Sequence, residues 1–119
     1  MFWVALGMPS GSAPGYRHPH LVIQNNAFNR SGISTIVVCS LTSNLKLGAA
    51  PGNVNLKKGE AGLTKRSVVN ISQIFTVDKN DLVKRIGTLS SRRMAEVLAG
   101  VRLLMEPRDP GDAPAASYA

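Results

Sequence analysis

Residues 33–41, ISTIVVCSL, decide the fold of this chain more than any other stretch. The centre of the stretch, residues 36–39, is apolar at every position, which is typical of a strand that is buried on both faces of a sheet. Cys39 belongs to this centre, so we expect it to pack as a small hydrophobic side chain. We therefore predict that residues 33–41 form the middle strand of a sheet.

Shorter apolar stretches on both sides of residues 33–41 predict further strands. The alternation of Val69 and Ile71 with Asn70 and Ser72 is typical of a half-exposed strand. Glycine, proline and polar residues separate the strands, and residues 7–15 are expected to form a long flexible loop. The other expected strands are residues 2–6, 20–25, 53–56 and 67–74.

The segment after these strands is predicted to hold one short helical turn, one edge strand and one long helix. Asp78 or Asn80 can cap a helical turn over residues 81–84, and residues 86–89 are expected to add the edge strand. Ser90 or Ser91 can cap a helix that ends near residue 105, before Pro107. The apolar positions of this helix follow helical spacing and predict one continuous face in the core. They are Met94, Val97, Leu98, Val101, Leu104 and Met105.

Size and composition predict one small domain of mainly β structure (α+β), a strongly bent sheet or barrel against which the C-terminal amphipathic helix packs. The chain has 119 residues, of which 44% are hydrophobic. We expect residues 1–105 to form the domain and residues 106–119, rich in proline, alanine and glycine, to form a flexible tail. Apolar runs are too short to cross a bilayer and the first eight residues lack positive charge, so we expect a cytoplasmic protein and no membrane contact.

The positive charge is concentrated in the predicted domain. Thirteen of the fourteen lysines and arginines but only four of the seven acidic residues lie within residues 1–105, which gives that part a formal charge of +9. Between residues 17 and 66, seven basic residues face only Glu60. Such a field attracts phosphate backbones, although a basic surface can also serve solubility alone.

Residues 16–20 bring together groups that can cleave RNA. His18 and His20 should point to the same side of an extended chain, with Arg17 on the other side unless the loop bends before Pro19. Cleavage through the 2′-hydroxyl of RNA needs a base, an acid and a cation at the phosphate, and histidine and arginine can supply all three. The alternative interpretation is that the two histidines simply lie where a surface strand begins.

A second candidate cluster follows the predicted central strand. Thr42, Ser43 and Asn44 bring two hydroxyls and an amide, and Lys46 is nearby. These groups can hold a phosphate or the edge of a base. The same residue types more often satisfy the backbone groups of a turn.

Other chemistries lack their characteristic residue patterns. The single cysteine excludes an intrachain disulfide and a cysteine-based zinc site. The spacing of histidines and acidic residues predicts no metal site. The glycines precede a strand rather than open a helix, so a nucleotide-binding loop is not expected, and we predict no cofactor.

Five segments, in order, make the chain resemble the MazF/PemK family of toxin endoribonucleases. They are Gly11-Ser12 with Gly15 and residues 19–26 (PHLVIQNN), and residues 39–45 (CSLTSNL), 51–54 (PGNV) and 67–79 (SVVNISQIFTVDK), followed by the predicted helix. The resemblance implies an SH3-like barrel and a homodimer. It also implies metal-independent, sequence-selective cleavage of single-stranded RNA to a 2′,3′-cyclic phosphate and a 5′-hydroxyl, with a cognate acidic antitoxin as inhibitor.

The resemblance also suggests residue roles. Thr42 takes the place of the family's catalytic threonine, and Gln73 resembles its substrate-contacting glutamine, with Ser67 and Asn70 on the same segment. His18 stands where the family usually has an arginine. Either Arg17 takes that place through flexibility of the loop, or His18 acts as an acid or base while Arg17 binds the phosphate, and a shared role is expected. The residues expected to contact substrate are His20, Ser43, Asn44, Lys46, Ser67, Asn70 and Gln73.

Departures from the family pattern leave alternatives. Ala5 and Ala13 stand where the family usually has acidic residues. A degenerate member that still binds RNA and antitoxin but no longer cleaves is therefore the first alternative. A toxin that poisons gyrase and a purely structural domain are the others.

Overall fold

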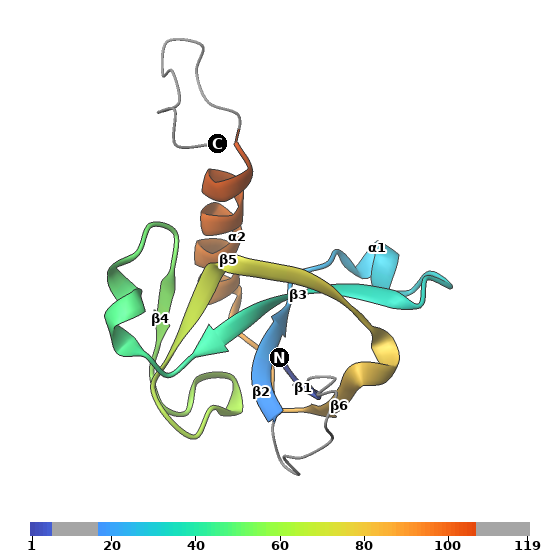
Figure 1. The fold of residues 1–119 in the computed structure, drawn as a ribbon, viewed down its shortest axis with the longest axis horizontal. Helices are drawn as coiled ribbons and strands as arrows, with labels where there is room; N and C mark the ends of the chain where they lie inside the picture. The colour runs from blue at the N-terminus through green and yellow to red at the C-terminus, as the bar shows by residue number, and fades with distance from the viewer. Residues whose placement is uncertain (6–16, 107–119) are drawn as a thin grey trace, which may run out of the picture.

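The computed structural model describes residues 1–5 and 17–106, and at Ala5 and Arg17 it describes the backbone alone (Figure 1). The loop expected at residues 7–15 and most of the tail expected at residues 106–119 lie outside the described residues. No helix in the described ranges has the length and apolar character needed to cross a membrane.

Six antiparallel strands form one strongly bent sheet, and a C-terminal helix packs against it (Figure 1). The strand order is β4-β5-β3-β2-β1-β6, which places β4 and β6 at the edges of the described sheet. The predicted fold class is confirmed, although the pairing stays open instead of closing into a barrel. The strands are β1 Phe2–Ala5, β2 Arg17–Val22, β3 Thr35–Thr42, β4 Val54–Leu56, β5 Ser67–Asp78 and β6 Leu82–Arg85.

Strand β3 occupies the middle of the sheet, as its apolar centre predicts. It pairs with β2 on one side and with β5 on the other. Ile36, Val38, Cys39 and Leu41 are all buried. Leu41 and Cys39 belong to the main hydrophobic cluster, to which β4, β5 and the C-terminal helix also contribute. Burial from both faces explains why the stretch is apolar at consecutive positions.

The helix α2, Ser91–Met105, begins and ends where the sequence predicts. The Ser90 hydroxyl oxygen accepts a hydrogen bond from the Arg93 amide, 3.2 Å away, and so caps the first turn. Val97 is buried, and Met94 and Val101 pack against the core.

The prediction of one continuous buried face on α2 is wrong for its remaining apolar residues. Leu98 and Leu104 are each 48% exposed and Met105 is 71% exposed. For Leu104 and Met105 Figure 1 shows the reason, since the C-terminal turns of α2 extend beyond the sheet. Leu98 lies nearer the middle of α2 and lines a cavity together with Leu21 and Met94.

The segment between β5 and α2 also differs from the prediction. Asp78 does cap a helical turn, but that turn is the 3-10 helix η3, Lys79–Asp81. Residues 82–85 form the edge strand β6 instead of a helical turn, and residues 86–89 form no strand. Pairing with β1 explains the difference, because Trp3 lies opposite Lys84 and Phe2 lies opposite Arg85. Tertiary contacts therefore override the local signal for a helical turn over residues 81–84.

Short helical turns occupy three loops for which the sequence predicts no regular secondary structure. They are α1 Asn26–Asn29, η1 Leu45–Ala49 and η2 Glu60–Gly62. Asparagine side chains cap the first two, with Asn25 accepting a hydrogen bond from the Ala27 amide and Asn44 from the Lys46 amide.

Candidate active site

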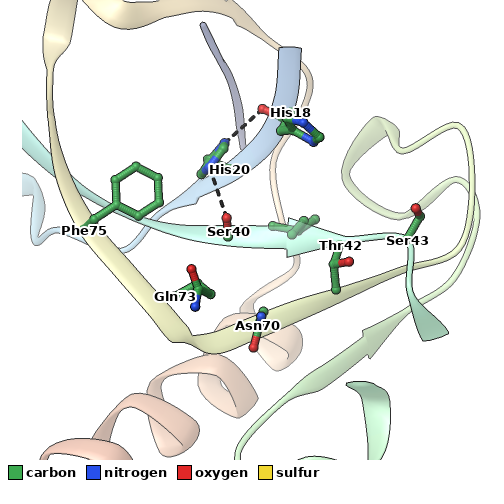
Figure 2. A pocket seen from close by; sticks show the side chains of 9 residues that line it. His18, His20, Ser40, Thr42, Ser43, Asn70, Gln73 and Phe75 are labelled. Carbon is green, nitrogen blue, oxygen red and sulfur yellow. Dashed lines mark hydrogen bonds between the residues drawn. The ribbon is translucent and has the colours of Figure 1, made fainter. Parts of the chain in front are cut away.

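The site forms where β5 breaks its pairing with β3. Cys39 pairs with Ile74 and Leu41 pairs with Val69, so residues 70–73 of β5 lie opposite Ser40 alone. A simple bulge adds one residue, and this irregularity is larger. Figure 2 shows β5 turning a corner beside the labelled Asn70 and Gln73. The corner turns both of these side chains towards the end of β3.

Asn53, directly before β4, holds this corner in place. Its side-chain oxygen accepts a hydrogen bond from the Ile71 amide at 2.8 Å. Its side-chain nitrogen donates to the Leu47 carbonyl at 2.9 Å and to the Asn70 side-chain oxygen at 3.3 Å. The asparagine thus replaces ladder hydrogen bonds that β5 loses at its corner.

The same contacts orient Asn70. Its side-chain oxygen accepts from both Asn53 and the Ser72 hydroxyl, the latter at 3.2 Å. The remaining polar group, the amide nitrogen, lies on the cavity side in Figure 2. Asn70 therefore presents a hydrogen-bond donor, which suits an oxygen of a phosphate or a base.

A cavity of about 460 Å³ lies between the corner of β5 and strands β2 and β3 (Figure 2). It gathers most of the residues predicted for catalysis and substrate contact. Its lining residues are His18, His20, Ser40, Leu41, Thr42, Ser43, Asn70, Gln73 and Phe75.

A second cavity, of about 280 Å³, adjoins the first. The two cavities share one wall, which is made by His18, Leu41, Thr42 and Ser43. The second cavity is completed by Trp3, Pro19, Leu63, Thr64, Lys65 and Ser67.

His20 is buried at the bottom of the first cavity, and both of its ring nitrogens have hydrogen-bond partners. It is 1% exposed, its Nδ1 lies 2.9 Å from the His18 carbonyl oxygen, and its Nε2 lies 3.2 Å from the Ser40 hydroxyl. A carbonyl oxygen only accepts, so Nδ1 carries the proton and, in the neutral ring, Nε2 accepts from Ser40. Phe75 packs edge-on against the ring, at 5.2 Å between ring centroids. His20 thus connects β2 with Ser40 of β3 and Phe75 of β5 at the first cavity.

The pKa of His20 makes a pH dependence of stability testable. Burial lowers the pKa of His20 from its usual 6.5, and the bond to the His18 carbonyl only partly offsets this effect. Just below pH 6.5 the unfolded chain therefore binds a proton at His20 that the folded chain does not, and the free energy of unfolding should fall as the pH falls.

Urea unfolding at pH 7 and at about pH 5.5 measures this dependence. In the variant His20→Asn, whose amide can still donate to the His18 carbonyl, the loss between the two pH values should be smaller than in the natural chain. Glu60, whose pKa lies below its usual 4.5, contributes only at lower pH. Equal losses in both proteins would contradict the assignment.

Cys39 is part of the core, as predicted. It is fully buried, and its thiol donates a hydrogen bond to the Asn70 carbonyl at 3.1 Å. Burial raises the pKa of Cys39 to about 12. The thiol is therefore protonated at neutral pH and does not serve as a nucleophile.

Thr42 is the last residue of β3 and stands on the wall between the two cavities. Its hydroxyl oxygen accepts a hydrogen bond from the Asn44 amide at 3.1 Å, which leaves its own proton to donate. Asn44 itself accepts from the Lys46 amide at 3.2 Å and so caps η1. The Asn44 side chain therefore satisfies a backbone group of a turn, which is the alternative role that the sequence left open for it.

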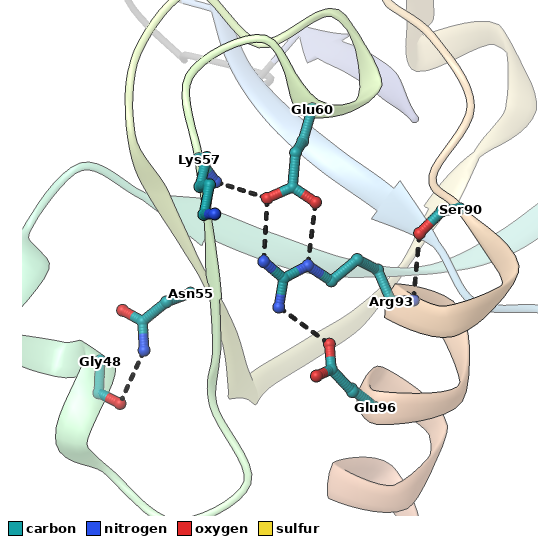
Figure 3. A network of polar contacts seen from close by, with 7 residues as sticks. All are labelled: Gly48, Asn55, Lys57, Glu60, Ser90, Arg93 and Glu96. Atoms are coloured by element: carbon teal, nitrogen blue, oxygen red, sulfur yellow. Dashed lines mark hydrogen bonds and ion pairs between the residues drawn. The ribbon is translucent and has the colours of Figure 1, made fainter.

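The loop after β4 carries Leu63, Thr64 and Lys65, which line the second cavity. Figure 3 shows that this loop is tied to α2. The Glu60 carboxylate accepts two hydrogen bonds from the Arg93 guanidinium, at 2.9 and 3.1 Å, and one from the Lys57 amide at 2.6 Å. Arg93 also pairs with Glu96 at 3.0 Å. The bond to Arg93 lowers the pKa of Glu60 more than any other contact does, so the pair stays charged at neutral pH.

The structure brings together most, but not all, of the predicted site residues. His18, His20, Thr42, Ser43, Asn70 and Gln73 line the first cavity, and Ser67 lines the second. Asn44 and Lys46 line neither of these two cavities. The side chain of Arg17 lies outside the described residues, although its backbone begins β2.

The residues predicted from the sequence do not include eight that line the two cavities, namely Ser40, Leu41, Phe75, Trp3, Pro19, Leu63, Thr64 and Lys65. Ser40 and Phe75 could have been found, because each lies two positions from a predicted site residue on the same strand and so shares its face. Trp3 reaches the site only through the pairing of β1 with β2, where it lies opposite Pro19.

In the part of the chain that the structure describes, no group of three His, Cys, Asp or Glu side chains is placed to hold a metal ion.

Comparisons with known proteins agree with this architecture. The family model described as "PemK-like, MazF-like toxin of type II toxin-antitoxin system" matches residues 1–105. Endoribonuclease MazF6 of Mycobacterium tuberculosis is 42% identical over 106 residues, which cover 89% of this chain and 93% of that protein. Endoribonuclease MazF of Staphylococcus saprophyticus is 34% identical over 87 residues, 73% of this chain and 72% of that protein.

Solved structures share the fold. The Mycobacterium tuberculosis toxin MazF-mt6 superposes with a TM-score of 0.73 at 16% identity, covering 91% of this chain and 97% of its own. An endoribonuclease from a mycobacterial species, solved in complex with its cognate antitoxin, gives a TM-score of 0.71 at 24% identity and covers 91% and 93%.

Proposed function

Because the chain belongs to the PemK-like, MazF-like toxin family of type II toxin–antitoxin systems, we propose that it is an endoribonuclease toxin that cuts single-stranded RNA, including messenger RNA. The observation that carries the proposal is the wall between the two cavities, on which His18, Thr42 and Ser43 stand together. These groups can bind a phosphate and move protons at one place, with open space for a nucleotide on either side.

The proposed reaction uses the nucleophile that RNA itself carries. The 2′-oxygen attacks the adjacent phosphorus, which forms the 2′,3′-cyclic phosphate, and the bond from phosphorus to the 5′-oxygen breaks. One proton leaves the 2′-hydroxyl and one reaches the 5′-oxygen, so the reaction consumes no water. We propose that it proceeds without a metal ion. The protein must supply a base, an acid and donors to the phosphate oxygens.

Residues of the shared wall match these needs. His18 is exposed on the wall, and its imidazole is proposed to serve as the base or the acid of the reaction. The Thr42 hydroxyl has a proton to donate to a phosphate oxygen, and Asn70 offers its amide from the first cavity. Arg17, next to His18 in sequence, is proposed to bind the phosphate, because a guanidinium suits paired phosphate oxygens.

Cleavage of end-labelled single-stranded RNA in EDTA tests the proposal. We expect discrete fragments whose termini are a 2′,3′-cyclic phosphate and a 5′-hydroxyl. Fragments with 5′-phosphate ends, or cleavage that appears only when a divalent metal is added back, would contradict the proposed chemistry. RNA that is bound but left intact would favour the degenerate, binding-only member of the family.

Two protein partners are proposed with this function, a cognate acidic antitoxin and a second copy of the chain. The positive charge of residues 1–105 favours an acidic partner. The exposed apolar end of α2, formed by Leu98, Leu103, Leu104 and Met105, supports association of two copies. Sedimentation as a monomer at micromolar concentration would contradict the homodimer.

A further inference from the structure

The second cavity is not explained by phosphate chemistry alone. We propose that it is a base subsite, which holds the base of the nucleotide next to the cut phosphate and thereby selects the cleavage sequence. This inference rests on the proposed function, because it assigns a part of the same site to the same RNA substrate.

The shared wall gives the first argument. His18, Thr42 and Ser43 line both cavities, so a phosphate held against them has one cavity on each side. Successive nucleotides leave a phosphate in opposite directions. An RNA strand that is cut at this wall therefore places one neighbouring base in the first cavity, beside Phe75 and Gln73. It places the other neighbouring base in the second cavity, beside Trp3 and Lys65.

The lining of the second cavity fits a base. Trp3, Pro19 and Leu63 supply apolar surface, and Thr64, Lys65 and Ser67 supply polar groups. An unstacked base has two apolar faces and a polar edge, and proteins commonly read it with an aromatic ring and a few hydrogen bonds. The volume, about 280 Å³, lies near the lower end of the roughly 300–1,000 Å³ typical of drug-sized ligands. This size suits one base.

The walls of this cavity are held from several sides. The backbone of Trp3 is paired on both sides, with Pro19 of β2 and with Lys84 of β6. The loop that carries Leu63, Thr64 and Lys65 is anchored by the Glu60–Arg93 pair. A preformed cavity discriminates between bases because it does not adapt its shape to each of them.

Trp3 is the single tryptophan of the chain, so its fluorescence reports on this cavity. The probe is a set of four homopolymeric, single-stranded oligodeoxynucleotides, which lack the 2′-hydroxyl and cannot be cut by the proposed reaction. We expect binding to change the Trp3 emission to a different extent for each base. The variant Lys65→Gln should weaken that binding. The control Lys58→Gln removes the same positive charge from an exposed residue of the same loop and should leave the base preference unaltered.

Cleavage of a randomised RNA pool gives the second readout. Sequencing the fragment ends of the natural chain yields a base preference at each position around the cut. In Trp3→Leu and in Lys65→Gln we expect the preference to weaken at one position beside the cut and to persist elsewhere, with kcat/KM for the preferred sequence lowered about tenfold or more in Trp3→Leu.

The outcomes separate the subsite from the proposed function. If the natural chain cuts RNA but both variants keep its full preference, or Trp3 emission stays constant while anisotropy shows that the probe binds, the subsite is wrong and the function stands. A folded Trp3→Leu is not required, because Lys65 is exposed and its replacement tests the same cavity. If the natural chain neither binds nor cuts RNA, both proposals fail.

Discussion

Replacing Thr42 by alanine is expected to lower kcat for RNA cleavage by about 100-fold or more, while changing RNA affinity little. Thr42 stands on the wall shared by the two cavities, and its hydroxyl oxygen accepts a hydrogen bond from the Asn44 amide, which leaves the hydroxyl proton to donate. A donor to a phosphate oxygen matters most when negative charge builds up on that oxygen in the transition state. The loss should therefore appear in kcat and much less in binding.

Two variants control this result. Thr42→Ser keeps the hydroxyl and should retain most of the activity. Thr35→Ala removes a threonine from the exposed start of the same strand and should leave activity unchanged. Because Thr42 also accepts a hydrogen bond from the Asn44 amide, circular dichroism and the melting temperature must show that Thr42→Ala remains folded. A folded Thr42→Ala protein that cleaves within a few-fold of the natural rate would contradict the assigned role.

Replacing Gly100 by alanine is expected to destabilise the protein by about 1–3 kcal/mol. Intrinsic helix propensity predicts the opposite sign, because alanine in the middle of a helix is better than glycine by roughly 1 kcal/mol. Gly100 is buried in α2 against Gly52, and an added methyl group would overlap the Gly52 carbonyl oxygen and lie 3.1 Å from Ile71 Cγ1. Backbone cannot move aside as a flexible side chain can, so packing should outweigh propensity.

Thermal unfolding measures the effect, with roughly 4–8 °C of melting temperature expected for each kcal/mol in a domain of this size. Gly32→Ala is the matched control, because a methyl group at Gly32 meets nothing within 4 Å. That variant should be neutral or gain about 0.4–1 kcal/mol. A melting temperature of Gly100→Ala equal to or above that of the natural chain would show that α2 can move away from the turn at Gly52.

The substitution Gly100→Ala should also change the geometry of the candidate active site. Gly52 immediately precedes Asn53, whose side chain holds the corner of β5 through Ile71 and Asn70. A shift of this turn would therefore move Asn70 relative to Thr42. The packing of a helix against a turn thus connects the stability of the fold to the geometry of the cavity.

Much of the fold can be predicted from local sequence patterns. The apolar run at the centre of β3 requires burial on both faces, and the structure places β3 in the middle of the sheet. The capping serine and the helical spacing predict α2, and both ends of α2 agree. Tertiary structure decided the predictions that failed: pairing with β1 made residues 82–85 a strand, and the C-terminal end of α2 extends beyond the sheet.

The candidate site could be predicted only in part. Residue chemistry indicated the histidines and the cluster of Thr42, Ser43, Asn44 and Lys46, and the resemblance to the family singled out Thr42 within that cluster. Sequence could not distinguish the roles of the two histidines. Burial and two ring contacts make His20 a structural residue, whereas His18 stands exposed on the wall between the cavities.

The sequence by itself determined the family, the basic character of residues 1–105, the central strand and the terminal helix, since each is written in residue types or in a local period. Only the tertiary structure decided that β5 turns a corner opposite Ser40, that Asn53 holds this corner, and that Trp3 and Lys65 share a cavity. These features depend on strand register and on contacts between residues far apart in the chain. No local pattern encodes them, because a register is set by the whole sheet.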